Sequence, residues 1–331
     1  MPGPLLTVFR RQAFPLGMAA AVALAFLAPA PAGGGVSWVG LTVNGGIFVV
    51  FFLHGVGLST EGLRAGLSRW KVHAVVQGFT FGVFPLLWWA ARAGAGRHLP
   101  PDLLLGFLYL AALPSTISSS VALTGVARGN VAAAAFNASL SSLLGVFLTP
   151  LLVRAGGVAA GELPLGRAIL EIAGLLLLPF LLGQLARPIA GAWFERYRRF
   201  TDLLDRGVIL ALVYLSFSGS VSAGLWSRYG FRAIALTIAG AALLLAVVLS
   251  LTRRTSRLLR FEVEDEIATV FCGSKKTLAS GIPMARLLFG DHPGLGFIVL
   301  PIMVYHQLQL LVGSVLAQRY ARRGGGTRAG Q

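Results

Sequence analysis

The chain has 331 residues, of which 56% are hydrophobic and only 12% are charged. Soluble domains carry roughly 25% charged residues, so this composition excludes an ordinary soluble protein and indicates an integral membrane protein. The formal charge of +16 does not indicate nucleic-acid binding. The arginines are dispersed between apolar runs, and no nucleic-acid recognition motif is present.

Ten apolar runs approach the roughly 20 residues that a helix needs to cross a bilayer. They predict an all-α polytopic membrane protein with ten transmembrane helices. The first run also resembles a signal peptide with a small-residue cleavage site, but its removal would leave nine spans and no even division. In chain order the runs cover residues 14–32, 38–58, 72–91, 103–126, 131–153, 166–186, 207–226, 231–252, 267–289 and 294–318.

The arginines and lysines between the runs predict an orientation, because cytoplasmic loops carry an excess of these residues. With a cytoplasmic N-terminus, nineteen of the 28 fall in inside segments and seven in outside segments. The other two are Lys275 and Lys276, within the ninth run. Both termini are therefore expected in the cytoplasm, with residues 319–331 as a cytoplasmic tail. The arginine-, alanine- and glycine-rich composition is typical of a bacterium, so we expect the bacterial cytoplasmic (inner) membrane.

Ten spans divide evenly into two halves of five. Because each half has an odd number of spans, the second half enters the membrane from the opposite side and is inverted relative to the first. Such inverted repeats are a common plan of secondary transporters. A weak internal similarity supports this at an offset of 162 residues, where Phe52–Leu63 aligns with Tyr214–Leu225. The same offset aligns Pro114 with Lys276, so the fourth and ninth spans are interrupted at equivalent positions.

These two interruptions are the most informative feature of the sequence. The fourth span contains "LPSTISSSVALTG", and the ninth contains "CGSKKTLASGIP". Proline removes a backbone donor, and unwound backbone at membrane depth persists only inside protein or beside a wet cavity. A buried charge costs between ~3 and ~10 kcal/mol and usually marks function. The alternative is an ordinary proline kink, with serines bonded to the preceding turn.

The fourth and fifth spans resemble the bile acid:sodium symporter superfamily, in its bacterial ten-helix branch. The ninth span, with "FCGSKKTLASGIPMARLLFG", and the tenth, with "IVLPIMVYHQLQLLVGSVLAQRYARR", carry the same resemblance. The resemblance implies two inverted five-helix repeats whose fourth and ninth spans break and cross. It implies a panel subdomain at about 14–58 and 166–226, and a core subdomain at about 72–153 and 231–318. Sodium-coupled members bind two sodium ions behind the crossing and an organic anion between core and panel.

The resemblance also implies positions for the site. Ser119, Ser120 and Ser142 stand where sodium-coupled members supply ligands, whereas Ala138 stands where a ligand is expected. In the third span, Thr80 replaces a glutamine, and Gln77 lies one turn earlier. The predicted substrate- and ion-binding residues are Gln77, Thr80, Pro114, Ser115, Thr116, Ser118, Ser119, Ser120, Asn137, Ser139, Ser142, Phe271, Ser274, Lys275, Lys276, Thr277, His306 and Gln307.

The ninth span departs most from the sodium-coupled pattern. Those members carry "EVGMQN", whose glutamate bridges both ions, and this chain has "FCGSKK" from Phe271 to Lys276. Sodium needs oxygen ligands, so we expect Lys275, with Lys276 beside it, to replace a bound sodium ion. Burial disfavours the charged form of a lysine, which makes a proton a candidate coupling ion. A purely structural role of the two lysines is the alternative.

Other polar residues in the spans have simpler interpretations. Glu171 lies near the start of its span and is expected to reach the interface, as is His54, whereas Asn44 is deeper and a candidate for the crevice. Asp265 and Glu266 are expected to form salt bridges with nearby arginines.

The sequence therefore predicts a secondary transporter of a small or amphipathic organic anion, working by alternating access without sodium. It carries no zinc or nucleotide motif and no paired carboxylates in the apolar spans, so we expect no enzyme, catalytic residue, metal or cofactor. Two alternatives stay open. One is a non-transporting membrane regulator, for example of calcium homeostasis, and the other is a sodium-coupled bile acid-type symporter.

The predicted orientation can be tested with a reporter enzyme that is active only outside the cytoplasm. Fused to the C-terminus, it should stay silent, because the charge bias keeps that end inside. The same reporter fused after residue 97, in a segment predicted outside, is the positive control. A strong signal from the C-terminal fusion would reverse the topology.

Overall fold

The computed structural model describes residues 4–30, 38–57, 68–96, 99–157, 165–290 and 292–323, and all regular structure within these ranges is helical. In chain order the elements are α1 (Pro4–Leu27), α2 (Trp38–Gly57), α4 (Trp70–Gly78), η1 (Phe79–Val83), α5 (Phe84–Ala95), α6 (Pro101–Ala112), α7 (Ser118–Val126), α8 (Val131–Ala155), α9 (Leu165–Ile172), η3 (Ala173–Leu177), α10 (Leu178–Arg196), α11 (Arg198–Ser222), α12 (Leu225–Leu258), α13 (Val263–Gly273), α14 (Gly281–Phe289) and α15 (Leu295–Arg323).

Five helices in the described part of the chain are long and apolar enough to cross a membrane. Leu16–Leu27, Asn44–Gly57 and Pro101–Ala112 are shorter apolar helices. The chain is therefore an all-helical, polytopic membrane protein. Each predicted apolar run falls on one to three consecutive helical elements, the third run on α4, η1 and α5 and the sixth on α9, η3 and α10. Some helices are longer than their run: α15 continues to Arg323, five residues into the predicted tail. The rest of that tail, residues 324–331, lies outside the described ranges.

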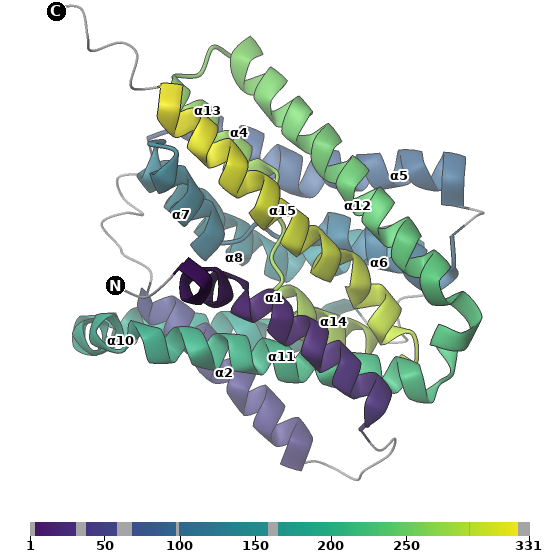
Figure 1. Cartoon of the computed structure of the whole chain (residues 1–331). Helices are drawn as coiled ribbons and strands as arrows, with labels where there is room; N and C mark the ends of the chain where they lie inside the picture. Colours follow the sequence, from purple (N-terminus) through teal and green to yellow (C-terminus); the bar gives the residue numbers. More distant parts are fainter. Residues whose placement is uncertain are drawn as a thin grey trace, which may run out of the picture.

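Two groups of helices share most of their contacts within the group (Figure 1). In one, α1 packs on α11, and α2 packs on α10 and α11. In the other, α15 packs on α6, α12, α14 and α7, while α13 lies against α4, α7, α8 and α12. The two groups meet where α11 packs on α15. They also meet where α9, which leads through η3 into α10, packs on α8 and α14.

Helices α2 and α10 approach so closely that their backbones touch. A Cβ added at Gly55 would lie 2.1 Å from Phe180 O, and one added at Gly183 would lie 2.0 Å from Phe52 O. No side chain larger than hydrogen fits at either position. In lipid there is no hydrophobic driving force for helix association, so helices associate through van der Waals contacts. Glycines that face each other allow the two backbones to approach closely and increase these contacts.

Prolines act in two ways in this fold. Pro150, Pro188 and Pro301 lie inside continuous α-helices. Pro85 and Pro179 follow the π-helical turns η1 and η3, which take up the missing N–H without breaking the helix. Within the fourth and ninth predicted spans the chain leaves helical geometry, at residues 113–117 between α6 and α7 and at 274–280 between α13 and α14.

Candidate functional site

The two helix breaks meet at one point inside the protein. The Thr277 amide donates a hydrogen bond of 3.0 Å to Pro114 O, and the Ser115 hydroxyl donates one of 2.7 Å to Cys272 O. A broken helix leaves its last carbonyls without intrahelical donors. Each break therefore supplies groups that satisfy the other, and we call this contact between residues 113–117 and 274–280 the crossing.

Helix α8 supports the crossing from one side. Ser141 Oγ accepts a hydrogen bond of 2.9 Å from the Ser115 amide, and Thr149 Oγ1 donates one of 2.9 Å to Ala112 O, at the end of α6. Gly145 lies between them, where an added Cβ would approach Pro114 Cγ to 2.7 Å. The break of the fourth span is thus held at a defined depth against α8.

Lys276 lies at the centre of the crossing and is completely buried. Its ammonium donates three hydrogen bonds to backbone carbonyls, at 2.7 Å to Thr80 O, 2.7 Å to Ala111 O and 2.6 Å to Leu113 O. It also lies 4.1 Å from the centre of the Phe84 ring. An ammonium has three N–H groups, so every proton of this side chain has a partner.

The backbone of Lys276 is held as firmly as its side chain. Gln309, on α15, accepts from the Lys276 amide through Oε1 at 2.9 Å and donates to the Lys276 carbonyl through Nε2 at 2.9 Å. Gln309 Nε2 also lies 2.9 Å from His306 Nδ1. The hydroxyl of Tyr305, on the same helix, donates to Ser274 O at 2.7 Å. Helix α15 thus fixes the break of the ninth span.

Lys275 has a different environment from its neighbour. Its Nζ donates to Ser119 O at 2.7 Å and lies 5.4 Å from the centre of the Phe271 ring. The hydroxyls of Thr116, Ser119 and Ser120 are hydrogen-bonded to one another nearby. Lys275 is buried, and the structure gives it one hydrogen-bonded acceptor where Lys276 has three.

Nothing at the crossing supplies the carboxylate of a sodium-coupled site. In the part of the chain that the structure describes, no three His, Cys, Asp or Glu side chains gather to hold a metal ion. Asp265 and Glu266 lie at the start of α13, where they pair with arginines, as expected: Asp265 with Arg69 at 3.3 Å, and Glu266 with Arg253 at 3.6 Å. Glu171, which was expected to reach the interface, is partly exposed and pairs with Arg167 at 3.0 Å.

Several predicted site residues lie away from the crossing. Gln77 donates to Asn137 O and Oδ1, at 3.1 and 3.3 Å, and the hydroxyls of Ser139 and Ser142 bond within their own helix. Sequence reasoning also missed polar residues that form hydrogen bonds at the crossing, because their signal is weak: each is a single polar residue in an apolar helix. These are Tyr109, which donates to Gly281 O, and Ser141, Thr149, Tyr305 and Gln309.

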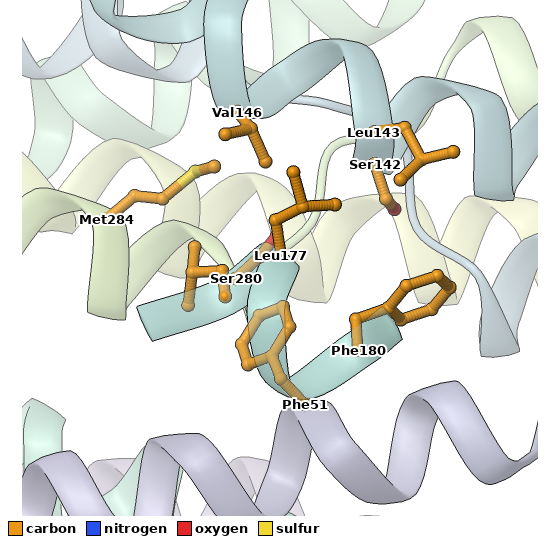
Figure 2. Close-up of a pocket in the computed structure, with 9 residues that line it drawn as sticks. Phe51, Ser142, Leu143, Val146, Leu177, Phe180, Ser280 and Met284 are labelled. Carbon is orange, nitrogen blue, oxygen red and sulfur yellow. The ribbon is translucent and has the colours of Figure 1, made fainter. Parts of the chain in front are cut away.

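A narrow apolar cleft lies between the two helix groups (Figure 2). Its lining is apolar except for the hydroxyls of Ser142 and Ser280. In Figure 2, Phe51 reaches into it from below, Phe180 lies at the lower right, Leu177 lies in the middle, and Val146 and Leu143 lie above. Ser280 belongs to the same break as the two lysines, so the cleft adjoins the crossing.

The hydrogen bond between the two breaks can be tested with Ser115→Ala. The substitution leaves Cys272 O without its donor inside the protein, and we expect a loss of about 1–3 kcal/mol of unfolding free energy. Ser250→Ala is the control, because Ser250 is exposed and bonds only to Ala246 O of its own helix. Chemical unfolding in detergent measures both, and equal effects of the two variants would contradict the geometry.

The chain matches the sequence profile of the SBF-like CPA transporter family over residues 12–322. It is 46% identical to the uncharacterised protein PA2026 of Pseudomonas aeruginosa, over 94% of this chain and 93% of that protein. It is 43% identical to YfeH of Escherichia coli, a candidate symporter by name, over 84% and 83%. Sodium/bile acid cotransporter 7 of Rattus norvegicus is 31% identical over 94% and 93%. The resemblance found in the sequence is confirmed: the chain belongs to the SBF-like CPA transporter family, whose members resemble bile acid:sodium symporters.

Proposed function

We propose that this transporter carries a small or amphipathic organic anion across the bacterial cytoplasmic membrane by alternating access, without sodium. The observation that carries the proposal is the coordination of Lys276, whose ammonium lies among three carbonyl oxygens at the crossing. Both termini lie in the cytoplasm in this proposal, in keeping with the charge bias of the connecting segments.

The proposed architecture has ten membrane spans in two inverted five-helix repeats. The panel comprises about 14–58 and 166–226, and the core about 72–153 and 231–318. Two features support it: the contacts of α1, α2, α10 and α11 with one another, and the breaks at 113–117 and 274–280, which the sequence offset of 162 relates. Movement of the core against the panel would open the cleft to each side in turn.

In this proposal the Lys276 ammonium takes the place of a sodium ion. A sodium ion in a protein is held by oxygen atoms, and three carbonyl oxygens already surround the ammonium. Hydrogen bonds of a charged group contribute roughly 1.5–3 kcal/mol each, which offsets much of the cost of burial. A sodium ion in the same cage would meet a positive charge instead of a carboxylate. The sequence assigned this role to Lys275; because Lys275 Nζ donates only to Ser119 O among the described residues while Lys276 Nζ donates to three carbonyls, the proposal gives the role to Lys276.

The cleft supports an amphipathic anion as substrate. Its walls are apolar, while the Ser280 hydroxyl offers a donor; the Ser142 hydroxyl already donates to Ala138 O of its own helix. The N-terminus of α14 begins at Gly281, next to Ser280, and a helix N-terminus favours negative charge. The buried positive charge of Lys275 and Lys276 in the same segment adds to this preference. An apolar body would pack on the phenylalanines, and an anionic group would face the break.

A sodium-coupled bile acid-type symporter is the second candidate. The observation that favours it is the name of the relatives called sodium/bile acid cotransporter 7, which share about 30% identity with this chain. The missing carboxylate and the occupied cage argue for the sodium-independent mechanism. The two candidates differ in one measurable property, the response of transport to sodium.

Transport by purified protein in liposomes tests the proposal. With a library of organic anions and imposed gradients, we expect uptake of an amphipathic anion that is unchanged when potassium replaces sodium. Ser142→Trp should lower uptake at least about tenfold, because the indole fills a cleft that must receive the substrate. Ser314→Trp, on an exposed face of α15, is the control. Saturable stimulation by sodium would establish the second candidate, and no uptake under any gradient would exclude a transporter.

The role of the tethered cation can be tested with Lys276→Ala. The variant leaves three carbonyls without donors, and we expect it to lose about 3 kcal/mol or more of stability. Added ammonium or methylammonium should restore part of the melting temperature in a saturable way, because the empty cage binds a free cation. Lys71→Ala is the control, since Lys71 is exposed on α4. A variant that is as stable as the native protein, or that no cation restores, would refute the cage.

A further inference from the structure

Helix α10 exposes one continuous apolar face. Its other face packs on α2, where a Cβ added at Gly57 of α2 would lie 2.8 Å from Phe194 Cζ. On the exposed face, Leu185, Ile189 and Trp193 follow at intervals of four residues, a spacing that places side chains on one side of a helix. Their exposed fractions are 77%, 90% and 48%. In a membrane-spanning helix such a face contacts the acyl chains of lipids.

The exposed face ends in an aromatic and basic cluster at the turn between α10 and α11, at the left edge of the molecule in Figure 1. The rings of Trp193 and Tyr197 lie 5.3 Å apart, and the Arg196 guanidinium lies 5.9 Å from the centre of the Tyr197 ring. Arg199 and Phe200, in the first turn of α11, are exposed. We call these five residues the tip cluster. Exposed tryptophan and tyrosine are typical of the membrane–water interface.

The two arginines of the tip cluster are available to a ligand. Among the described residues, neither Arg196 nor Arg199 has a hydrogen-bonded acceptor or an ion-pair partner. Arg187, two turns earlier on α10, differs because it donates to Val56 O at 2.7 Å. Glu195 lies in the same turn but has a partner of its own. A guanidinium presents several N–H groups in a plane and binds phosphate through pairs of hydrogen bonds.

The order of these side chains along α10 matches the order of groups along a phospholipid. Leu185 and Arg196 are eleven residues apart, which is about 16 Å along a helix that rises 1.5 Å per residue. One leaflet of a bilayer has a hydrocarbon layer of about 15 Å, half of the total thickness. An acyl chain beside Leu185 and Ile189 therefore places the ester groups near Trp193 and the phosphate at the arginines.

From this arrangement we propose that the tip cluster binds one anionic phospholipid, whose phosphate lies between Arg196 and Arg199. The acyl chains follow the exposed face of α10. A headgroup without an amine is preferred, because the ammonium of a zwitterionic lipid is repelled by the two guanidinium groups. In the proposed orientation the turn lies in the cytoplasm, so the lipid belongs to that leaflet. The inference goes beyond the proposed transport function and depends on no substrate.

Native mass spectrometry of the full chain in detergent tests the site. The probes are phosphatidylglycerol and phosphatidylcholine with identical acyl chains, and we expect saturable binding of one phosphatidylglycerol at least about fivefold tighter than phosphatidylcholine. The double variant Arg196→Gln, Arg199→Gln should lose this preference. The control Arg319→Gln, Arg322→Gln removes the same charge from exposed positions on α15 and should keep it. A native chain without the preference, or an equal loss in the control, would overturn the proposal.

Two further measurements identify the occupant. Glycerol 3-phosphate, which has the headgroup charge and no acyl chain, should not displace the lipid; displacement would instead establish a site for a free phosphate. A photoreactive benzophenone amino acid in place of Phe200 should label phosphatidylglycerol in nanodiscs, whereas crosslinks between two chains would show that this face joins copies of the protein. Both double variants should melt at the native temperature without added lipid, because all four arginines are exposed.

Discussion

The structure depends on the mutual satisfaction of two broken helices and one ammonium group. A helix that stops inside a membrane leaves carbonyl oxygens without donors, and a lysine in the same place leaves a charge without water. Lys276 eases both problems, since its three protons meet three carbonyls: those of Ala111 and Leu113 at the end of α6, and that of Thr80 in η1. Either element alone would be costly to bury, and together they form the fixed centre of the core helices.

The surrounding helices keep this centre in place and connect it to the rest of the protein. Helix α8 holds the first break through Ser141 and Thr149, and α15 holds the second through Tyr305 and Gln309. The side chain that the site uses most, Lys276, is therefore fixed at its tip by α6 and η1 and at its backbone by α15. A change in any of these contacts is transmitted to the break.

Much of this arrangement could be predicted from the sequence, and the parts that could not share a physical reason. Charged residues in an apolar run and a proline followed by hydroxyls are local signals, so the two breaks and Lys275 and Lys276 were found. Proline alone was a poor guide, because Pro150 and Pro301 lie in continuous helices. Gln309 was missed because its role is to bind the backbone of a residue 33 positions away. Such a contact depends on packing and leaves no pattern along the chain.

The covalent attachment of the Lys276 ammonium has an electrical consequence. A carrier that takes up free ions moves their charge through the membrane field, which is worth about 2.3 kcal/mol per charge for every 100 mV. A cation bound to the chain returns with the empty carrier and contributes nothing to the net current of a full cycle. The voltage dependence of turnover then reports only the charge on the cargo and on any proton that travels with it.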